Sequence, residues 1–168
     1  VILGTGVGAG IVIGKKIHKG KNKIAGEWGH NPLPWANEGE LPGKRCYCGR
    51  TGCLETFISG PAIEREFKNL HGKNLNMKNI VKESGAGNLK AEQTIRNLED
   101  RLARALAHVI NILDPDSIVL GGGLSNIDRL YSNVPKIWAE YIFSDDVSTV
   151  LSKARFGDSS GVRGAAWL

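Results

Sequence analysis

The sequence predicts an α/β fold, because strand-like and helix-like segments alternate along its 168 residues. Short β-branched runs indicate strands at the start of the chain and at residues 117–120. The apolar residues of 89–113 recur every three or four positions, which is the spacing of one helix face. Hydrophobic residues make up 41% of the chain, enough for one core at this length. We therefore expect a single α/β domain without internal repeats.

The first 60 residues are rich in turn signals. Residues 1–17 read as strand, Gly-rich turn, strand, turn and strand, and we expect a β-meander there. Residues 26–60 carry Pro32, Pro34 and Pro42 together with many glycines, which predicts a long irregular segment. Such a segment is normally ordered only where a bound metal ion or a functional site holds it in place.

Helices dominate the next part of the chain. One is expected from Pro61 to Gly72, with proline in the first turn, and a shorter one near Met77 to Glu83. The clearest helix is 89–113, and Asp114-Pro115-Asp116 ends it. The strand at 117–120 lacks polar alternation, so we expect it to be buried on both faces.

The last 45 residues continue the alternation of helices and strands. The pattern predicts a helix over roughly 127–142, a strand around 147–155, a turn at 157–161 and a short final helix that ends at Leu168. These elements complete the α/β pattern.

Charge and hydropathy exclude two classes of partner. The formal net charge is +5, with five lysines in one short stretch that we interpret as a solvated hairpin: Lys15, Lys16, Lys19, Lys21 and Lys23. No aromatic side chains or helix that could contact nucleic-acid bases accompany these lysines, so nucleic-acid binding is not expected. The longest apolar runs are far shorter than the about 20 residues of a membrane span. We expect a cytoplasmic protein and, because the chain starts on a strand without an initiator Met, a fragment of a longer one.

The three cysteines of the chain lie close together and predict a metal site. Cys46, Cys48 and Cys53 follow His30 in a Gly-rich segment, and one His with three Cys is a complete ligand set for structural Zn²⁺. An odd number of cysteines argues against a disulfide framework. The glycines between them let the backbone turn sharply. Three free, buried thiols are the alternative interpretation.

Two carboxylates bracket this cluster. Glu27 stands three residues before His30, and Glu55 stands two residues after Cys53. Carboxylates held in place accept hydrogen bonds from sugar hydroxyls, and an imidazole that ligates zinc through one nitrogen has a second nitrogen for a ligand. The alternative is that Glu27 and Glu55 are solvated loop acids.

Two Gly-rich loops each follow a strand: Gly4, Thr5 and Gly6, and Gly121, Gly122 and Gly123. Such loops let backbone N–H groups close on phosphate oxygens, although tight packing explains them equally well. Neither loop matches the Walker pattern or the Rossmann fingerprint, which argues against a P-loop kinase and a dinucleotide dehydrogenase.

The motifs together resemble those of a known family. Gly26-Glu27-x-Gly-His30 followed by Cys46-x-Cys48-Gly-x-x-Gly-Cys53-x-Glu55 closely resembles the signature of the ROK family of bacterial sugar kinases and sugar-responsive repressors. The loops at 4–6 and 114–123 and the ending 157–166 resemble its second phosphate loop, adenosine loop and usual C-terminus. The stretches 26–35 and 53–60 are most similar to the fructokinases (manno(fructo)kinases) of that family.

The resemblance implies an actin-like ATPase, ribonuclease-H-like fold of two lobes. Residues 1–168 would form the C-terminal lobe, with 26–60 as an inserted zinc- and sugar-binding segment. The implied reaction is the ATP-dependent, Mg²⁺-assisted phosphorylation of a hexose, from D-fructose to fructose 6-phosphate. Glu27, His30 and Glu55 would bind the sugar, and the two Gly loops would line the nucleotide. The implied partners are the hexose, ATP, the N-terminal lobe and a second copy of the chain in a homodimer.

One part of the family pattern has no counterpart in this chain. The first phosphate loop and the Asp that acts as general base belong to the N-terminal lobe, so we expect no catalytic residue here and no turnover by the chain alone. Two further interpretations stay open. One is the sugar-sensing domain of a ROK repressor, and the other is a zinc-stabilised module with no small-molecule role.

Overall fold

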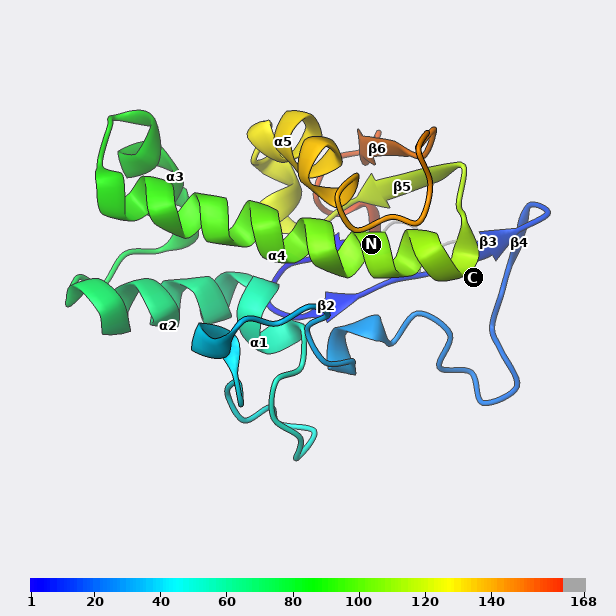
Figure 1. Ribbon diagram of the computed structural model, residues 1–168, viewed down its shortest axis with the longest axis horizontal. Helices are drawn as coiled ribbons and strands as arrows, with labels where there is room; N and C mark the ends of the chain where they lie inside the picture. The colour runs from blue at the N-terminus through cyan, green and yellow to red at the C-terminus, as the bar shows by residue number, and fades with distance from the viewer. Residues whose placement is uncertain (162–168) are drawn as a thin grey trace.

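The computed structural model describes residues 1–161 and is built around one long helix (Figure 1). Helix α4 (Leu89–Leu113) runs along most of the long axis of the molecule. Helices α2 (Gly60–His71) and α3 (Met77–Gly85) pack on its N-terminal half. Helix α5 (Arg129–Trp138) and the strands β5 (Ser117–Leu120) and β6 (Val150–Lys153) form a second layer beside it. The structure confirms the predicted α/β class.

The helix boundaries agree closely with the sequence prediction. Ser59 accepts the N-terminal cap hydrogen bond of α2, and Gly72 ends that helix in the left-handed region at φ 69°. Asn76 and Asn88 cap α3 and α4 in the same way. Residues 89–113 form one helix, as predicted. Its central part, 101–107, is buried on all sides, whereas Leu89 and Ile112 near its ends are exposed.

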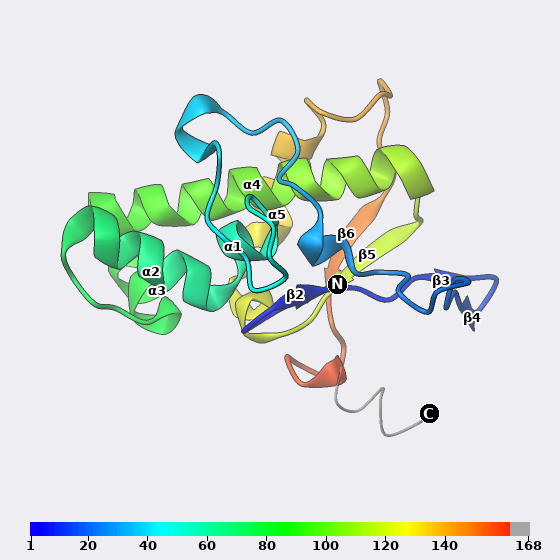
Figure 2. The same cartoon turned by 90° about the horizontal axis from the view of Figure 1, so that it is seen from below.

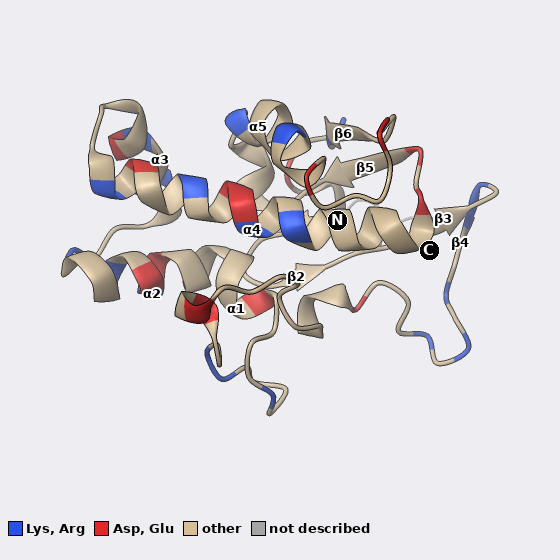
Figure 3. Cartoon of the chain, viewed as in Figure 1, with Lys and Arg blue, Asp and Glu red and all other residues tan. Residues whose placement is uncertain are grey.

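The first 17 residues form two separate hairpins rather than a continuous meander. Strand β1 (Ile2–Leu3) pairs with β2 (Val7–Gly8), and β3 (Val12–Ile13) pairs with β4 (Lys16–Ile17), each antiparallel. The backbone N–H of Ala9 donates to the Gly26 carbonyl at 2.9 Å, so β2 leads into a contact with residues 26–30. The residues from 12 to 24 are exposed, which confirms the solvated basic hairpin; its lysines are visible in Figure 3.

The parallel pair β5–β6 corrects one prediction. Ile118 and Leu120 are buried, but Val119 is 44% exposed, so β5 is buried on one face only. Ile118 and Leu120 belong to the same hydrophobic core as residues of α4 and α5, whereas the other face of β5 is exposed. Figure 2 shows the pair from below. Ile2 of β1 bridges Gly121 at the end of β5. The expected final helix at Leu168 lies outside the described residues.

Two other elements differ in length from the prediction. Helix α5 ends at Trp138, where turns replace the predicted continuation to residue 142. Strand β6 covers only the centre of the predicted 147–155 segment. Residues 26–54 are irregular, as predicted, with two short 3₁₀ turns, η1 (Trp28–His30) and η2 (Glu38–Glu40).

Ion pairs tie this irregular segment and α5 to the long helix. Glu40 and Arg104 are both buried, and two nitrogens of Arg104 donate to the Glu40 carboxylate at 3.0 and 2.8 Å. Arg129 of α5 donates to Glu92 and Glu99 of α4 at 2.7 and 2.6 Å. Figure 3 shows acidic and basic residues distributed along α4. Within the described part of the chain, no helix is long and apolar enough to cross a membrane.

Candidate functional site

The predicted metal ligands come together in space. The ligand atoms of His30, Cys46, Cys48 and Cys53 all lie within 4.8 Å of one another. The Sγ atoms of Cys48 and Cys53 are 3.6 Å apart, and Cys46 Sγ is 3.5 Å from His30 Nδ1. A tetrahedral zinc with Zn–S bonds of about 2.3 Å separates its sulfur ligands by about 3.8 Å. The donor types and their spacing therefore fit Zn²⁺.

Tight turns bring these four ligands to one point. Cys46 N donates to the Arg50 carbonyl at 2.8 Å, and Gly49 closes that turn at φ 90°. Pro32 pairs with Cys53 in an isolated β-bridge, which places His30 beside the last cysteine. The predicted role of the intervening glycines is confirmed, because a side chain at φ 90° would strain the turn.

The local environment affects the thiols in opposite directions. A backbone hydrogen bond at Arg50 lowers the pKa of Cys48 to about 7. Burial raises the pKa of Cys53 to about 12. A thiolate at Cys53 therefore needs a nearby positive charge at neutral pH, which a bound metal ion supplies.

A residue that the sequence analysis missed contacts the cluster. The Tyr47 hydroxyl lies 2.9 Å from His30 Nε2, and the two rings meet edge to face with centroids 5.1 Å apart. Loss of water around the phenol oxygen, together with the nearby Glu55 carboxylate, raises the pKa of Tyr47. The hydroxyl is therefore protonated at neutral pH. The sequence signal that could have identified Tyr47 is its position between Cys46 and Cys48, two of the predicted metal ligands.

Glu55 links the cluster to the first Gly-rich loop. It is the first residue of α1 (Glu55–Ile58), a short helix that the sequence analysis did not predict. Its Oε2 accepts a hydrogen bond from Val7 N at 3.0 Å, and a Cβ at Gly6 would lie only 2.8 Å from that oxygen. The absence of a side chain at Gly6 lets the carboxylate lie against the loop.

Glu27 lies on the exposed side of the same region. It precedes η1, whose Gly29 packs so closely on β2 that a Cβ there would lie 2.0 Å from the Val7 carbonyl. The negative charges of Glu55 and Glu27 both help to raise the pKa of Tyr47. Trp28 is buried, and its indole N–H has no acceptor within the described residues. Buried donors normally bond to protein, water or a ligand.

The two Gly-rich loops lie side by side. Leu3 N donates to the Gly121 carbonyl at 2.9 Å, so the end of β1 runs parallel to the end of β5. Gly122 has a φ of 80°, and a Cβ there would lie 2.5 Å from the Leu3 carbonyl. Thr5 and Gly123 are exposed. The predicted nucleotide residues therefore lie next to each other, and Gly6 connects them to Glu55.

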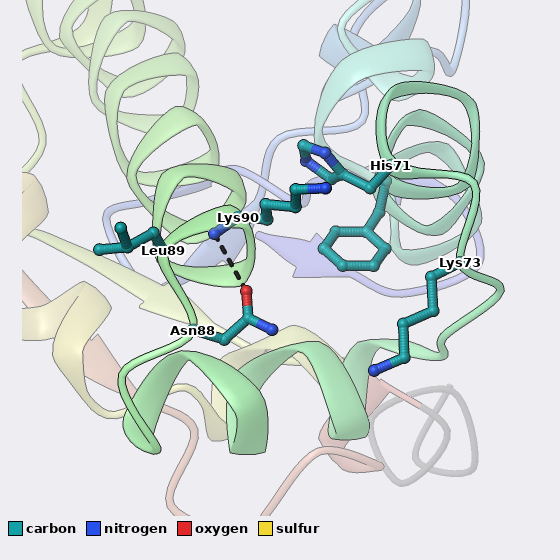
Figure 4. Close-up of a pocket in the computed structure, with 6 residues that line it drawn as sticks. His71, Lys73, Asn88, Leu89 and Lys90 are labelled. Carbon is teal, nitrogen blue, oxygen red and sulfur yellow. Dashed lines mark hydrogen bonds between the residues drawn. The ribbon is translucent and has the colours of Figure 1, made fainter.

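A cavity of about 460 Å³ lies elsewhere, between the C-terminal end of α2 and the start of α4 (Figure 4). Its lining residues are Phe67, His71, Lys73, Asn88, Leu89 and Lys90. Lys90 extends toward His71 in Figure 4, and Lys73 forms an ion pair with Glu83 at 2.7 Å. None of the predicted site residues lines this cavity.

Curated relatives match the whole chain. N-acetyl-D-glucosamine kinase from Photobacterium profundum is 39% identical over 172 residues, and the match covers 100% of this chain and 57% of that protein. N-acetyl-D-glucosamine kinase from Yersinia enterocolitica is 37% identical with the same coverage. The chain thus spans little more than half the length of these relatives. The names of these relatives support a sugar-kinase family. They do not support the predicted similarity to fructokinases within that family.

Solved structures share the fold. A ROK hexokinase from Thermus thermophilus superposes with a TM-score of 0.83 at 28% identity over 99% of this chain and 56% of its own. A ROK family glucokinase from Streptomyces griseus, in complex with glucose and AMPPNP, has a TM-score of 0.83 at 27% identity, covering 98% and 57%. These neighbours confirm the expected actin-like ATPase fold. The ROK family model matches residues 1–168, and the chain therefore belongs to the ROK family.

Proposed function

We propose that this chain forms the sugar- and nucleotide-binding part of an ATP-dependent hexose kinase. The observation that carries the proposal is the contact of Glu55 with Val7 and Gly6, which joins the metal-ligand cluster to the Gly-rich loops. A kinase needs its acceptor sugar and the phosphates of ATP side by side, because phosphoryl transfer depends mainly on positioning.

Each predicted residue has a role in this proposal. Glu27 and Glu55 accept hydrogen bonds from sugar hydroxyls, and His30 offers its Nε2 to the same ligand. A zinc ion bound by His30 and the three cysteines would hold the ring in one orientation. The backbone of the loops at 4–6 and 121–123 lines the nucleotide, whose phosphates carry Mg²⁺.

The relatives favour N-acetyl-D-glucosamine as the sugar, and we propose it as the first substrate to test. D-fructose is the second candidate. It is favoured by the stretches 26–35 and 53–60, which resemble the fructokinases and contain Glu27, His30 and Glu55. Both sugars offer hydroxyls to the same acceptors, so the pocket decides between them by the placement of a few polar groups.

We further propose that residues 1–168 are the C-terminal lobe of a longer kinase. The relatives are longer than this chain by almost half of their own length. The general base that receives the proton of the sugar hydroxyl would then come from the N-terminal lobe.

A sugar-sensing domain of a repressor is a second candidate function. A ROK family transcriptional regulator superposes with a TM-score of 0.81 at 28% identity, over 98% of this chain and 43% of that protein. In such a domain the same pocket would bind a sugar without phosphorylating it.

A coupled assay of ADP release tests these proposals. The full-length protein that contains residues 1–168 is incubated with MgATP and, in turn, N-acetyl-D-glucosamine, fructose, mannose and glucose. We expect sugar-dependent ADP release by the full-length protein and none by residues 1–168 alone. Sugar binding without ADP release would favour the repressor, and the absence of both would contradict the proposed site.

A further inference from the structure

Tyr47 contacts the proposed sugar site at His30 without being one of the predicted site residues. Its side chain is 82% exposed, and its hydroxyl lies 2.9 Å from Nε2 of His30. The phenol oxygen therefore contacts one of the three residues that we propose as sugar ligands, at the ring nitrogen that faces away from the cysteines.

The position of the ring proton of His30 determines which atom donates in the hydrogen bond with Tyr47. Its Nδ1 faces Cys46 Sγ at 3.5 Å and is the nitrogen that points into the metal-ligand cluster. A ring that binds a metal through Nδ1 keeps its proton on Nε2, so Nε2–H donates and the Tyr47 oxygen accepts. The same N–H is the only group that this ring can offer to a sugar hydroxyl.

We infer that Tyr47 is an affinity-determining gate that competes with the sugar for the Nε2–H of His30. The inference rests on the proposed function, because it takes the sugar to contact His30. In the structure the phenol oxygen takes the place of a sugar hydroxyl, and binding of the sugar moves the tyrosine aside. A sugar without a hydroxyl in reach of Nε2 leaves Tyr47 where it is.

The surroundings of Tyr47 allow this movement. Over residues 1–161, the contact with His30 is the only side-chain hydrogen bond of Tyr47. The T-shaped ring contact is with the same histidine. An exposed side chain held by one hydrogen bond reorients on the picosecond to nanosecond timescale, so the gate does not slow sugar entry. The gate lowers the affinity for the sugar, because the hydrogen bond between His30 and Tyr47 must break before His30 can bond to the sugar.

The variant Tyr47→Phe keeps the ring and removes the competing oxygen. In the full-length enzyme we expect the KM and the equilibrium dissociation constant of the sugar to fall by about twofold to about tenfold, the equivalent of one net hydrogen bond. The kcat, the KM for ATP and the zinc content should stay unchanged. The matched control is Tyr141→Phe, because the Tyr141 ring contacts Trp35 and its hydroxyl makes no hydrogen bond within the described residues.

A second measurement needs no sugar. In zinc-loaded protein labelled with ¹⁵N-histidine, the Nε2 proton of His30 should exchange faster with water in Tyr47→Phe than in the wild type. Unchanged exchange, or a sugar affinity that is unchanged or weaker in the variant, would overturn the inference. If the wild type phosphorylates no sugar, the proposed function fails. The exchange measurement still decides whether Tyr47 accepts a hydrogen bond from the Nε2–H of His30.

Discussion

Arg104 and Glu40 form a buried two-point ion pair between helix α4 and the irregular segment 26–54. Arg104 Nη1 donates to Glu40 Oε2 at 3.0 Å, and Nη2 donates to Oε1 at 2.8 Å. Nη1 also donates to the carbonyls of Pro34 and Trp35. Because Glu40 lies in the sequence between His30 and Cys46, this pair holds the loop that joins two members of the Cys/His cluster.

Removal of one partner of this pair should destabilise the protein. Glu40→Gln leaves Arg104 and Arg101 in the interior without their shared carboxylate. The expected loss in unfolding free energy is about 3 kcal/mol, a fall of about 6–12 °C in Tm. Thermal unfolding followed by circular dichroism measures it. The control is Glu38→Gln, an exposed neighbour on the same turn, which should unfold like the wild type.

The same pair predicts a pH dependence. Burial alone would raise the pKa of Glu40, but hydrogen bonds from Arg104 and Arg101 outweigh it and lower the pKa from 4.5 to about 2. A carboxylate with a depressed folded pKa stabilises the protein above its unfolded value, and the stabilisation disappears as pH falls from about 4.5 toward 2. Urea unfolding at several pH values should show the gap between wild type and Glu40→Gln narrowing over this window. A constant gap would contradict the assignment.

The helices and the clustering of the Cys and His side chains could be predicted from the sequence because their signals are local. The apolar spacing and Asn88 define α4, and cysteine spacing with His30 defines the cluster. The Glu40–Arg104 pair joins residues 64 positions apart, and no local pattern marks such a pair. The exposure of Val119 was missed for a related reason, because an apolar run does not tell which neighbours cover each face.

The metal site predicts a selective effect of histidine substitution. Freshly purified protein should contain about one zinc per chain, and His30→Ala should lose most of it, because a three-cysteine site lacks its fourth ligand. Metal analysis by mass spectrometry measures the content. His71→Ala is the matched control, since His71 packs on Phe67 away from the cluster. Wild-type protein that contains no zinc after purification would count against the predicted zinc site.

The close packing of η1 on β2 predicts an effect of one added methyl group. A Cβ at Gly29 would lie 2.0 Å from the Val7 carbonyl, so Gly29→Ala must push His30 away from its position. We expect weaker zinc retention during chelator titration and faster hydrogen exchange across 26–54. Gly10→Ala places a Cβ where no atom lies within 4 Å and should behave as the wild type. Equal chelator sensitivity of the two variants would show that the turn tolerates the shift.

Binding of the sugar by the carboxylates beside the Cys/His cluster is the core of the proposed function. The most direct test is the sugar affinity of Glu27→Gln in the full-length protein, measured together with its zinc content. Glu27 is exposed and lies outside the ligand set, so zinc should be retained while the affinity falls at least about tenfold, the loss of a charge-assisted hydrogen bond. Unchanged sugar affinity with zinc retained would contradict the claim.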